Sequence, residues 1–314
     1  MKLKEILGIE YPIIQGGMAN IATGEFAAAV SNAGGFGLIG AGGMDAASLR
    51  ENIIICRDKL DADKKDKFGV NLMLMNPAVD EMAKVVVEEG VKLVTTGAGF
   101  PGKYMADWKA AGIFVIPVVS STVMAKMMER QGADALIAEG CESGGHVGEM
   151  TTMALVPQIV DAVSIPVIAA GGIADGRQLL AALALGAVGV QVGTVLLASE
   201  ECPIHENYKN AILKAKDNDT IVTGRIAGTP VRILKNEMAR EYVKKEKEGA
   251  DKMDLEMYTL GSLRRAVFDG DTKTGSLMAG QVSGQLKEIR TIKAIFEEMC
   301  QGAEQTLNVL KGCV

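Results

Sequence analysis

The sequence predicts an α/β fold, a (β/α)₈ barrel, from the spacing of its apolar segments. Runs of strand length are each followed by glycine or a polar turn and then by a helical pattern, and they start 20 to 32 residues apart. A single β-α unit has that size, and eight units in succession match a barrel of roughly 200 to 250 residues. The eight runs begin near Pro12, Phe36, Phe68, Leu93, Ile113, Ala135, Pro166 and Gly189.

Each strand reads as a continuous apolar run, as in 114–119 and 166–170. Strands of parallel sheets have this pattern because helices cover both of their faces. Amphipathic helical patterns lie between them, for example at 78–89 and at 178–185, where Gly186 provides a helix C-cap. A doubly wound open sheet is the structural alternative. The eighth repeat, together with glycine-bearing loops after nearly every strand, favours the closed barrel.

The repeat of β-α units ends after Thr194. We therefore divide the chain into three parts. Residues 1–199 form the predicted barrel, 200–274 a charged, helix-rich cap or insertion for substrate, and 275–314 a segment that packs back on the barrel. This last part ends in a helical pattern at 289–310. The charged run 244–248 is interpreted as an exposed helix face.

Composition limits the classes of partner. The chain has 314 residues, a net charge of −6 and a pI of about 5.2, which argues against nucleic-acid or membrane-surface binding. We see no signal peptide and no apolar run long enough to cross a bilayer. Five cysteines are scattered without metal-ligand spacing, so we expect a cytoplasmic protein with no metal site of its own: Cys56, Cys141, Cys202, Cys300 and Cys313.

Glycines follow the seventh and eighth predicted strands. Gly171 and Gly172 end the seventh, and Gly193 with Thr194 ends the eighth. Barrels bind phosphate in these two loops, where bare backbone N–H groups and a helix N-terminus donate hydrogen bonds. The alternative is that these glycines only make tight turns. Their presence in both loops favours a phosphate site.

Small and amide residues end the strands on the other side of the barrel. Residues 15–19 follow the first strand, Asn71 lies in the third, and 95–99 close the fourth. Such residues accommodate a flat heteroaromatic ring and bond its edge, and an isoalloxazine is the obvious candidate. Taken alone, Asn71 could equally be a satisfied core amide.

Residues 35–40 fit the pattern G-x-G-x-x-G of dinucleotide-binding folds. In that motif the glycines follow the strand and open a helix. Here they lie inside the apolar run, and the helical pattern starts only near Asp45. We therefore assign these glycines to strand and turn geometry.

His146 is the candidate catalytic residue. It lies in a glycine-rich stretch, 140–148, just after the sixth strand, at the end of the barrel where catalytic residues gather. A structural histidine bonded to a carbonyl is the alternative. Glu139 ends the sixth strand and could bond a cofactor hydroxyl, bond backbone amides in the loop, or form a buried ion pair. His205, the other histidine, is interpreted as ordinary cap packing.

Several of these segments together resemble the nitronate monooxygenase superfamily of FMN-binding barrels. Within it the whole chain, including 231–236 and 275–281, is similar to the flavin-dependent enoyl-acyl-carrier-protein reductases of type II. The segments that carry the superfamily resemblance are 12–18, 69–71, 94–99, 144–146, 168–173 and 191–194.

The resemblance implies FMN, NAD(P)H as co-substrate and His146 as the catalytic-site histidine. Some members of the family respond to monovalent cations, but no sequence feature assigns such a site. Ser143 departs from the pattern, which has alanine or another small residue there. The expected FMN-binding residues are Gly16, Gly17, Met18, Asn71, Thr96, Glu139, Gly144, Gly145, Gly171, Gly172, Gly193, Thr194, Met278, Ala279 and Gln281, with Gly280 near the flavin.

The function implied is reduction of trans-2-enoyl-acyl carrier protein with NAD(P)H in bacterial fatty-acid elongation. A nitronate monooxygenase, which uses oxygen on alkyl nitronates, is the main alternative, and a flavin-free phosphate-binding barrel is a third. Acyl carrier protein is acidic, so a local basic patch is required, and we also expect a homodimer. The cap offers as candidates, unless they are simply solvated, Arg232, Lys235, Arg240, Arg264 and Arg265.

Overall fold

The computed structural model describes residues 2–312 and confirms the predicted barrel. Eight parallel strands follow the order β1-β9-β8-β6-β5-β4-β3-β2. The ring closes where Ile14 pairs with Phe36, whose carbonyl accepts from the Gln15 amide at 2.9 Å. The strands start within a residue of their predicted positions: β1 (Ile13–Gln15), β2 (Gly37–Gly40), β3 (Phe68–Met73), β4 (Leu93–Gly97), β5 (Phe114–Val119), β6 (Leu136–Glu139), β8 (Val167–Ala170) and β9 (Gly189–Val192).

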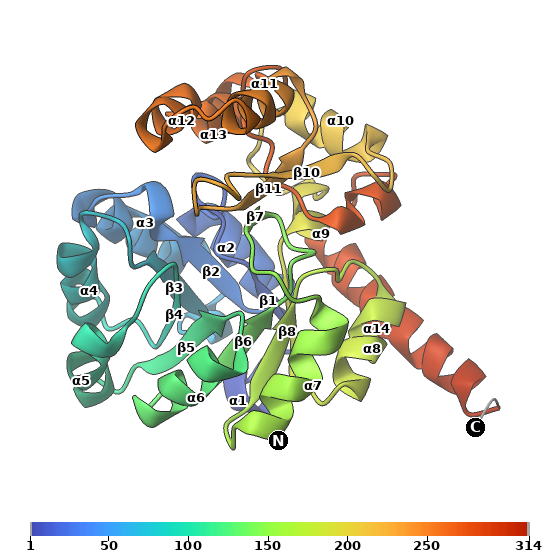
Figure 1. The fold of residues 1–314 in the computed structure, drawn as a ribbon. Coiled ribbons are helices and arrows are strands. Elements are labelled where there is room, and N and C mark those ends of the chain that lie inside the picture. The colour runs from blue at the N-terminus through green and yellow to red at the C-terminus, as the bar shows by residue number, and fades with distance from the viewer. Residues whose placement is uncertain (1, 313–314) are drawn as a thin grey trace.

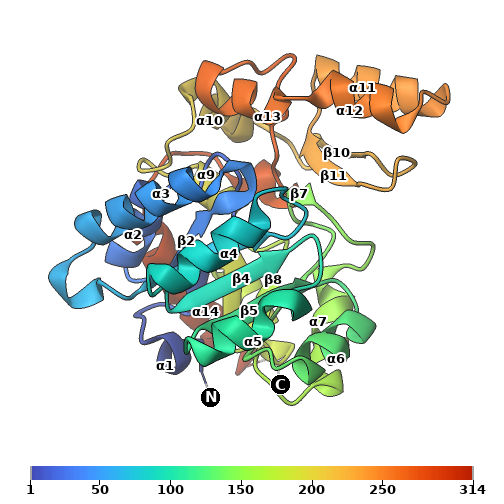
Figure 2. The same cartoon turned by 90° about the vertical axis from the view of Figure 1, so that its left-hand side faces the viewer.

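Helices surround this barrel, and a short helix covers its lower end (Figures 1 and 2). The covering helix is α1 (Leu3–Leu7), whose Leu3 and Leu7 pack with the apolar strand residues that fill the barrel interior. The surrounding helices are α2 (Gly24–Asn32), α3 (Ala46–Lys59), α4 (Val79–Glu88), α5 (Gly102–Ala110), α6 (Thr122–Arg130), α7 (Thr152–Ala162) and α8 (Gly176–Ala184). A single turn, α9 (Thr194–Leu197), follows β9.

Side-chain caps begin several helices where the sequence predicts their start. The Asp175 carboxylate accepts from the amides of Arg177 and Gln178 at the start of α8. That helix is followed by Gly186 at φ +97°, in the left-handed region that glycine adopts without a Cβ clash. The helices predicted at 78–89 and 178–185 are thus confirmed with small shifts of their ends.

The glycines of the dinucleotide-like pattern serve strand packing, as expected. A Cβ on Gly37 would lie 1.9 Å from the Ala27 carbonyl oxygen of α2, and one on Gly40 would lie 2.7 Å from the Met18 carbonyl oxygen. The helix that follows, α3, starts only at Ala46, with Asp45 as its N-cap. The pattern therefore allows α2 and the β1 loop to approach β2 closely.

Above the barrel lies a second layer that contains its own small sheet (Figure 2). Strands β10 (Thr220–Thr223) and β11 (Val231–Leu234) form an antiparallel hairpin. The third strand is β7 (Gly145–His146), which comes from the loop after barrel strand β6 and pairs with β11. The helices of this layer are α10 (Glu206–Lys214), α11 (Glu237–Lys247), α12 (Lys252–Thr259) and α13 (Ser262–Arg264).

Two sequence interpretations concern this upper layer. The interpretation of His205 as a packing residue of the cap is confirmed. Its Nδ1 accepts from the Asn207 amide and so caps the start of α10. The charged run 244–248 is only partly the exposed face that was expected. Glu246 is buried, and its carboxylate accepts from the amides of Ile226 and Ala227 in the β10–β11 loop.

The chain ends in the long helix α14 (Ile292–Leu310), which runs beside α8 (Figure 1). Gly176 permits this contact, because a Cβ there would lie 2.3 Å from the Ala303 amide nitrogen. No helix within residues 2–312 has the length and hydropathy needed to cross a membrane. Four of the five cysteines are free thiols in this range, and Cys313 lies outside the described residues.

Candidate functional site

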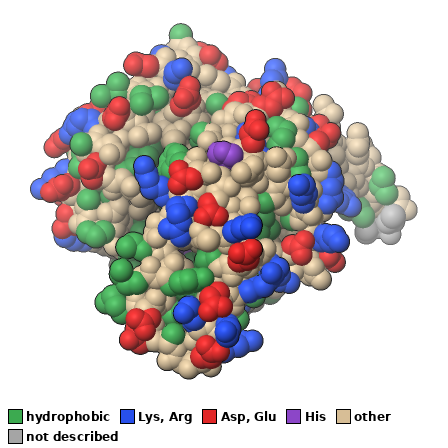
Figure 3. All heavy atoms as spheres, turned by 90° about the horizontal axis from the view of Figure 1, so that it is seen from above, with side chains coloured by type: hydrophobic (Ala, Val, Ile, Leu, Met, Phe, Trp, Pro, Cys, Tyr) green, Lys and Arg blue, Asp and Glu red, His purple; other side chains and the backbone are tan. Residues whose placement is uncertain are grey.

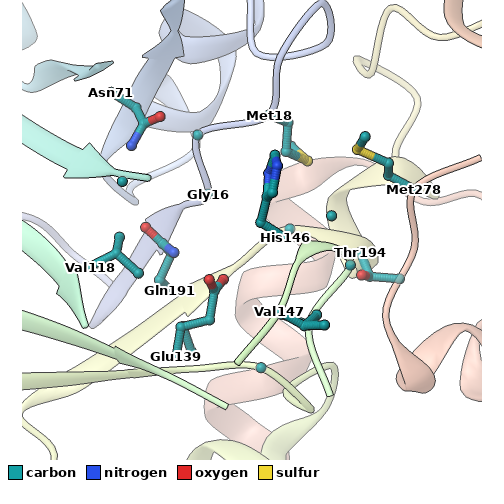
Figure 4. A pocket seen from close by; sticks show the side chains of 18 of the residues that line it. Gly16, Met18, Asn71, Val118, Glu139, His146, Val147, Gln191, Thr194 and Met278 are labelled. Atoms are coloured by element: carbon teal, nitrogen blue, oxygen red, sulfur yellow. The ribbon is translucent and has the colours of Figure 1, made fainter. Parts of the chain in front are cut away.

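A cavity of about 430 Å³ opens at the carboxyl ends of the barrel strands, beneath the upper layer (Figure 4). Strand ends supply its floor, including Glu139 of β6 and Gln191 of β9. Leu263 and Met278, which follow the barrel in the chain, contribute to its other wall. Its size and mixed apolar and polar lining are typical of small-molecule and cofactor sites.

Most of the residues predicted from the sequence come together around this cavity. Those that line it are Gly16, Gly17, Met18, Asn71, Glu139, Gly144, Gly145, His146, Gly171, Gly172, Gly193, Thr194 and Met278. Three predicted residues do not line it. Thr96 is buried in β4, and Ala279 packs against Gly144. Gln281 is exposed, and its backbone amide donates to the Glu142 carbonyl.

Sequence reasoning left out several lining residues, among them Ser143, Val147 and Gln191. Gln191 and Ser143 lie within segments that the sequence singles out, at the end of β9 and in the glycine-rich loop. Gln191 is a polar residue in an otherwise apolar strand, and that is the signal that could have identified it.

The predicted phosphate loops meet at one side of the cavity. Gly171 and Gly172 have φ values of +92° and +72°, and a Cβ on Gly171 would lie 2.8 Å from the Gly140 carbonyl oxygen. Asp175 already caps α8, so the free donors are those of the loops rather than of that helix. The Thr194 hydroxyl accepts from the Gly280 amide at 2.9 Å and retains its own proton for a ligand.

Asn71 lies on the other side of the cavity (Figure 4). Its Nδ2 donates to Thr95 Oγ1 at 2.8 Å, and this bond holds the side-chain amide in one orientation. Gly17 makes room for it, because a Cβ on Gly17 would lie 2.2 Å from Asn71 Cγ. The amide is therefore satisfied on its nitrogen side, while its oxygen has no partner within residues 2–312 and is available to a ligand.

His146 projects into the cavity near Met18 and Met278 (Figure 4). The carbonyl bond of a purely structural histidine is missing here: among the described residues its imidazole has neither a hydrogen bond nor an ion pair. Desolvation by the cavity walls lowers the pKa of His146 below its ordinary value. The ring is thus neutral at neutral pH, with one N–H to donate.

Glu139 points into the floor of the cavity, beside Gln191 (Figure 4). Burial raises the pKa of its carboxyl group to about 7. Of the three roles left open by the sequence, an ion pair and bonds to loop amides do not occur, because the carboxylate has no partner within residues 2–312. It remains free to bond a ligand hydroxyl.

Unsatisfied polar atoms around the barrel mouth fit the flavin mononucleotide that the sequence resemblance implies. Buried polar atoms normally have hydrogen-bond partners, so an unpaired set beside a cavity indicates a polar ligand. Among the residues that line the cavity, Ser143 Oγ and Gln191 Oε1 are buried without a partner within residues 2–312. Together with the glycine loops, they suit a planar group with donors and acceptors on its edge, joined to a phosphate.

The chain is similar over nearly its whole length to several known proteins. FabK from Thermotoga maritima has a similar solved structure, with a TM-score of 0.95 and 48% sequence identity over 99% of this chain and 98% of that one. A probable nitronate monooxygenase of Staphylococcus saprophyticus is 34% identical over 96% of this chain and 97% of its own. A relative in Mycobacterium tuberculosis, 31% identical over 95% of this chain and 94% of its own, is a dehydrogenase of a bicyclic carboxyl-CoA.

The family model described as nitronate monooxygenase matches residues 1–302, which include every residue that lines the cavity. The match therefore extends over the barrel, the upper layer and most of α14. The chain belongs to the nitronate monooxygenase family.

Proposed function

We propose that this protein is an FMN-dependent enoyl-[acyl-carrier-protein] reductase that uses NAD(P)H. The observation that carries the proposal is the full-length likeness to FabK, at 48% identity, compared with 34% for the probable nitronate monooxygenase. The likeness extends through the upper layer, which contributes Leu263 to the lining of the cavity. The reaction adds a hydride, derived from NAD(P)H, and one proton to the carbon–carbon double bond of a trans-2-enoyl thioester, and it releases NAD(P)⁺.

Bound FMN would supply the hydride chemistry between nicotinamide and enoyl thioester. The glycine loops at Gly171–Gly172 and at Gly193 would hold its phosphate, and Asn71 and Gln191 would bond polar edges of the ligand. Glu139, uncharged below a pH of about 7, would offer an O–H to a cofactor hydroxyl without setting a full negative charge beside the phosphate.

His146 handles the charge that develops on the substrate. Hydride addition at the β-carbon places negative charge on the thioester oxygen and the α-carbon, and a donor positioned there lowers the barrier. A neutral imidazole with an unengaged N–H fits this role as hydrogen-bond donor or general acid. The side chains of Met18 and Met278 lie beside the ring in the cavity.

Acyl carrier protein stays a predicted partner, and the structure narrows the basic residues that could contact it. Arg232 is wrong as a candidate, because its side chain is buried and bonded within the protein. Lys235, Arg240 and Arg264 are exposed, although the Lys235 ammonium group donates to the Asn218 carbonyl. Arg265 donates to two carbonyl oxygens nearby. Figure 3 shows acidic and basic side chains interspersed over this face, so a docking patch would be small.

An anaerobic assay tests the proposal. The purified protein is mixed with NADH or NADPH and a crotonyl thioester in the absence of oxygen, and nicotinamide absorbance is followed. We expect oxidation of one nicotinamide per thioester reduced. An absence of turnover with both nucleotides, on acyl carrier protein as well as on coenzyme A, would reject the reductase.

Nitronate monooxygenase is the second candidate, favoured by the description of the family and by the staphylococcal relative. Oxygen uptake with an alkyl nitronate, without nicotinamide, would support it. A flavin-free phosphate-binding barrel is the third, and flavin absorbance bands in the purified protein would exclude it.

A further inference from the structure

The segment that carries His146 is built into the upper layer rather than left as a free barrel loop. Gly145 and His146 pair with Arg232 and Val231 of β11. The next residue, Val147, donates its amide to the Pro230 carbonyl at 3.1 Å. The β10–β11 hairpin thus fixes the backbone on which the imidazole is mounted.

The buried guanidinium of Arg232 adds side-chain hydrogen bonds to this backbone pairing between the loop and the hairpin. Arg232 is 6% exposed, and its Nε and Nη2 both donate to the Cys141 carbonyl, at 3.1 and 2.9 Å. Its Nη1 donates to Thr220 Oγ1 of β10 at 3.1 Å. No carboxylate forms an ion pair with it within residues 2–312. One side chain therefore ties the start of the glycine-rich loop to both strands of the hairpin.

Such an arrangement is unusual for a residue that only stabilises a surface. Burial of a cation is costly, and buried arginines are normally paired with carboxylates. Glu142, which is near enough to favour the charged form of Arg232, binds the Thr152 amide instead. The buried guanidinium thus forms its hydrogen bonds with the loop, at the Cys141 carbonyl, which lies five residues before His146.

We propose that Arg232 is a positioning residue, which holds the 141–146 loop so that His146 faces the reacting atoms. The inference rests on the proposed function for the reaction that it assists, but its structural part does not. Loss of the guanidinium would leave the Cys141 carbonyl without its donors and would free the loop ahead of β7. Displacement of a catalytic group by about 1 Å costs on the order of 10²-fold in rate.

The test compares Arg232→Met and Arg232→Lys with the wild-type holoenzyme. Methionine retains volume but no donor, whereas lysine retains the charge but cannot reproduce the two-donor contact with one carbonyl. Arg130→Met, at an exposed arginine that ends α6 on the barrel, is the matched control. The measurements are the FMN content, the melting temperature, kcat and KM for crotonyl thioester, and hydrogen exchange of residues 141–147.

We expect FMN to be retained, and hydrogen exchange of 141–147 to rise in both Arg232 variants. We expect kcat to fall about 10- to 100-fold in Arg232→Met, the range for loss of a charged hydrogen bond, and less in Arg232→Lys. KM should change less than kcat, because the cavity walls are untouched. Arg130→Met should stay within about twofold of wild type, as other surface substitutions do.

An unchanged kcat and unchanged exchange in a folded Arg232 variant would overturn the proposal. If Arg232→Met does not fold, Arg232→Lys decides by the same two readouts, and Thr220→Val, which removes only the Nη1 contact, adds a milder change in the same direction. Failure of the wild type to reduce the thioester would instead reject the proposed function. Hydrogen exchange still tests the loop in that case, since it requires no substrate.

Discussion

His146 lies opposite Val231 in the antiparallel pairing of β7 with β11. The upper layer therefore determines the position of the candidate catalytic side chain, whereas the strand ends that surround this side chain belong to the barrel. The cavity depends on both layers, because a shift of the hairpin would move the imidazole relative to Gly171 and Gln191. This relationship makes His146 the first residue to test.

Replacement of His146 by alanine should abolish enoyl reduction while leaving flavin binding intact. General acid catalysis contributes about 10²–10⁴-fold, so kcat should fall by that order. FMN content, measured from the absorbance of the purified variant, should stay near wild type. His146→Gln separates the roles, since an amide donates a hydrogen bond but no proton. Turnover of the alanine variant close to wild type would remove His146 from the mechanism.

Glu139 should make the stability of the FMN-free protein depend on pH. Its pKa is about 7 in the folded state and about 4.5 as a free side chain, so the folded state holds the extra proton between these values. The free energy of unfolding should therefore decrease as pH rises from about 4.5 to 7. Glu139→Gln should remove this loss, which amounts to at most about 3 kcal/mol.

The measurement is urea unfolding of wild type and Glu139→Gln, both without FMN, at pH 5 and pH 8. The variant should be the more stable protein at pH 8, and the difference should be smaller at pH 5. An equal difference at both values would contradict the predicted titration. Rebinding of FMN to each protein then shows whether the carboxyl group contacts the cofactor.

The barrel could be predicted from sequence because its signal is repeated and local. Each strand is a short apolar run followed by glycine, and each helix has its own amphipathic pattern, so the eight starts agree with the structure within a residue. The continuous apolar pattern of these strands does not indicate which side chains face the cavity. Strands buried on both faces lack the alternation that separates inward from outward positions. Thr96 and Gln191 illustrate this limit, as only the second lines the cavity.

The attachment of His146 to β11 could not be predicted, for a different reason. β7 is two residues long, begins with Gly145 and follows Gly144, so it has no strand signal of its own. Its pairing with Val231 joins segments that are far apart in sequence, and such contacts depend on the complete fold. The burial of Arg232 follows from the same pairing. An arginine in a charged segment otherwise indicates solvated surface.

Gly171 should be required for the cofactor beyond its backbone conformation. Gly171→Ala introduces a Cβ 2.8 Å from the Gly140 carbonyl oxygen and places alanine at φ +92°. Gly90→Ala is the matched control, because it has φ +62° but no atom within 4 Å. Both should lose about 1–2 kcal/mol of stability from the left-handed conformation. Only Gly171→Ala should weaken FMN binding, as measured by titration of the FMN-free proteins; equal affinities would contradict a phosphate site at this loop.

Gly37 should affect the stability of the barrel and not the binding of nicotinamide. A Cβ at this position would lie 1.9 Å from the Ala27 carbonyl oxygen, so Gly37→Ala forces α2 away from β2. Overpacking of this kind costs about 1–3 kcal/mol, which urea unfolding of the variant would detect. If the 35–40 stretch instead bound a dinucleotide, the variant would show a raised KM for NADH in its folded fraction. We expect that KM to stay at the wild-type value, because the glycine faces helix α2 rather than the cavity.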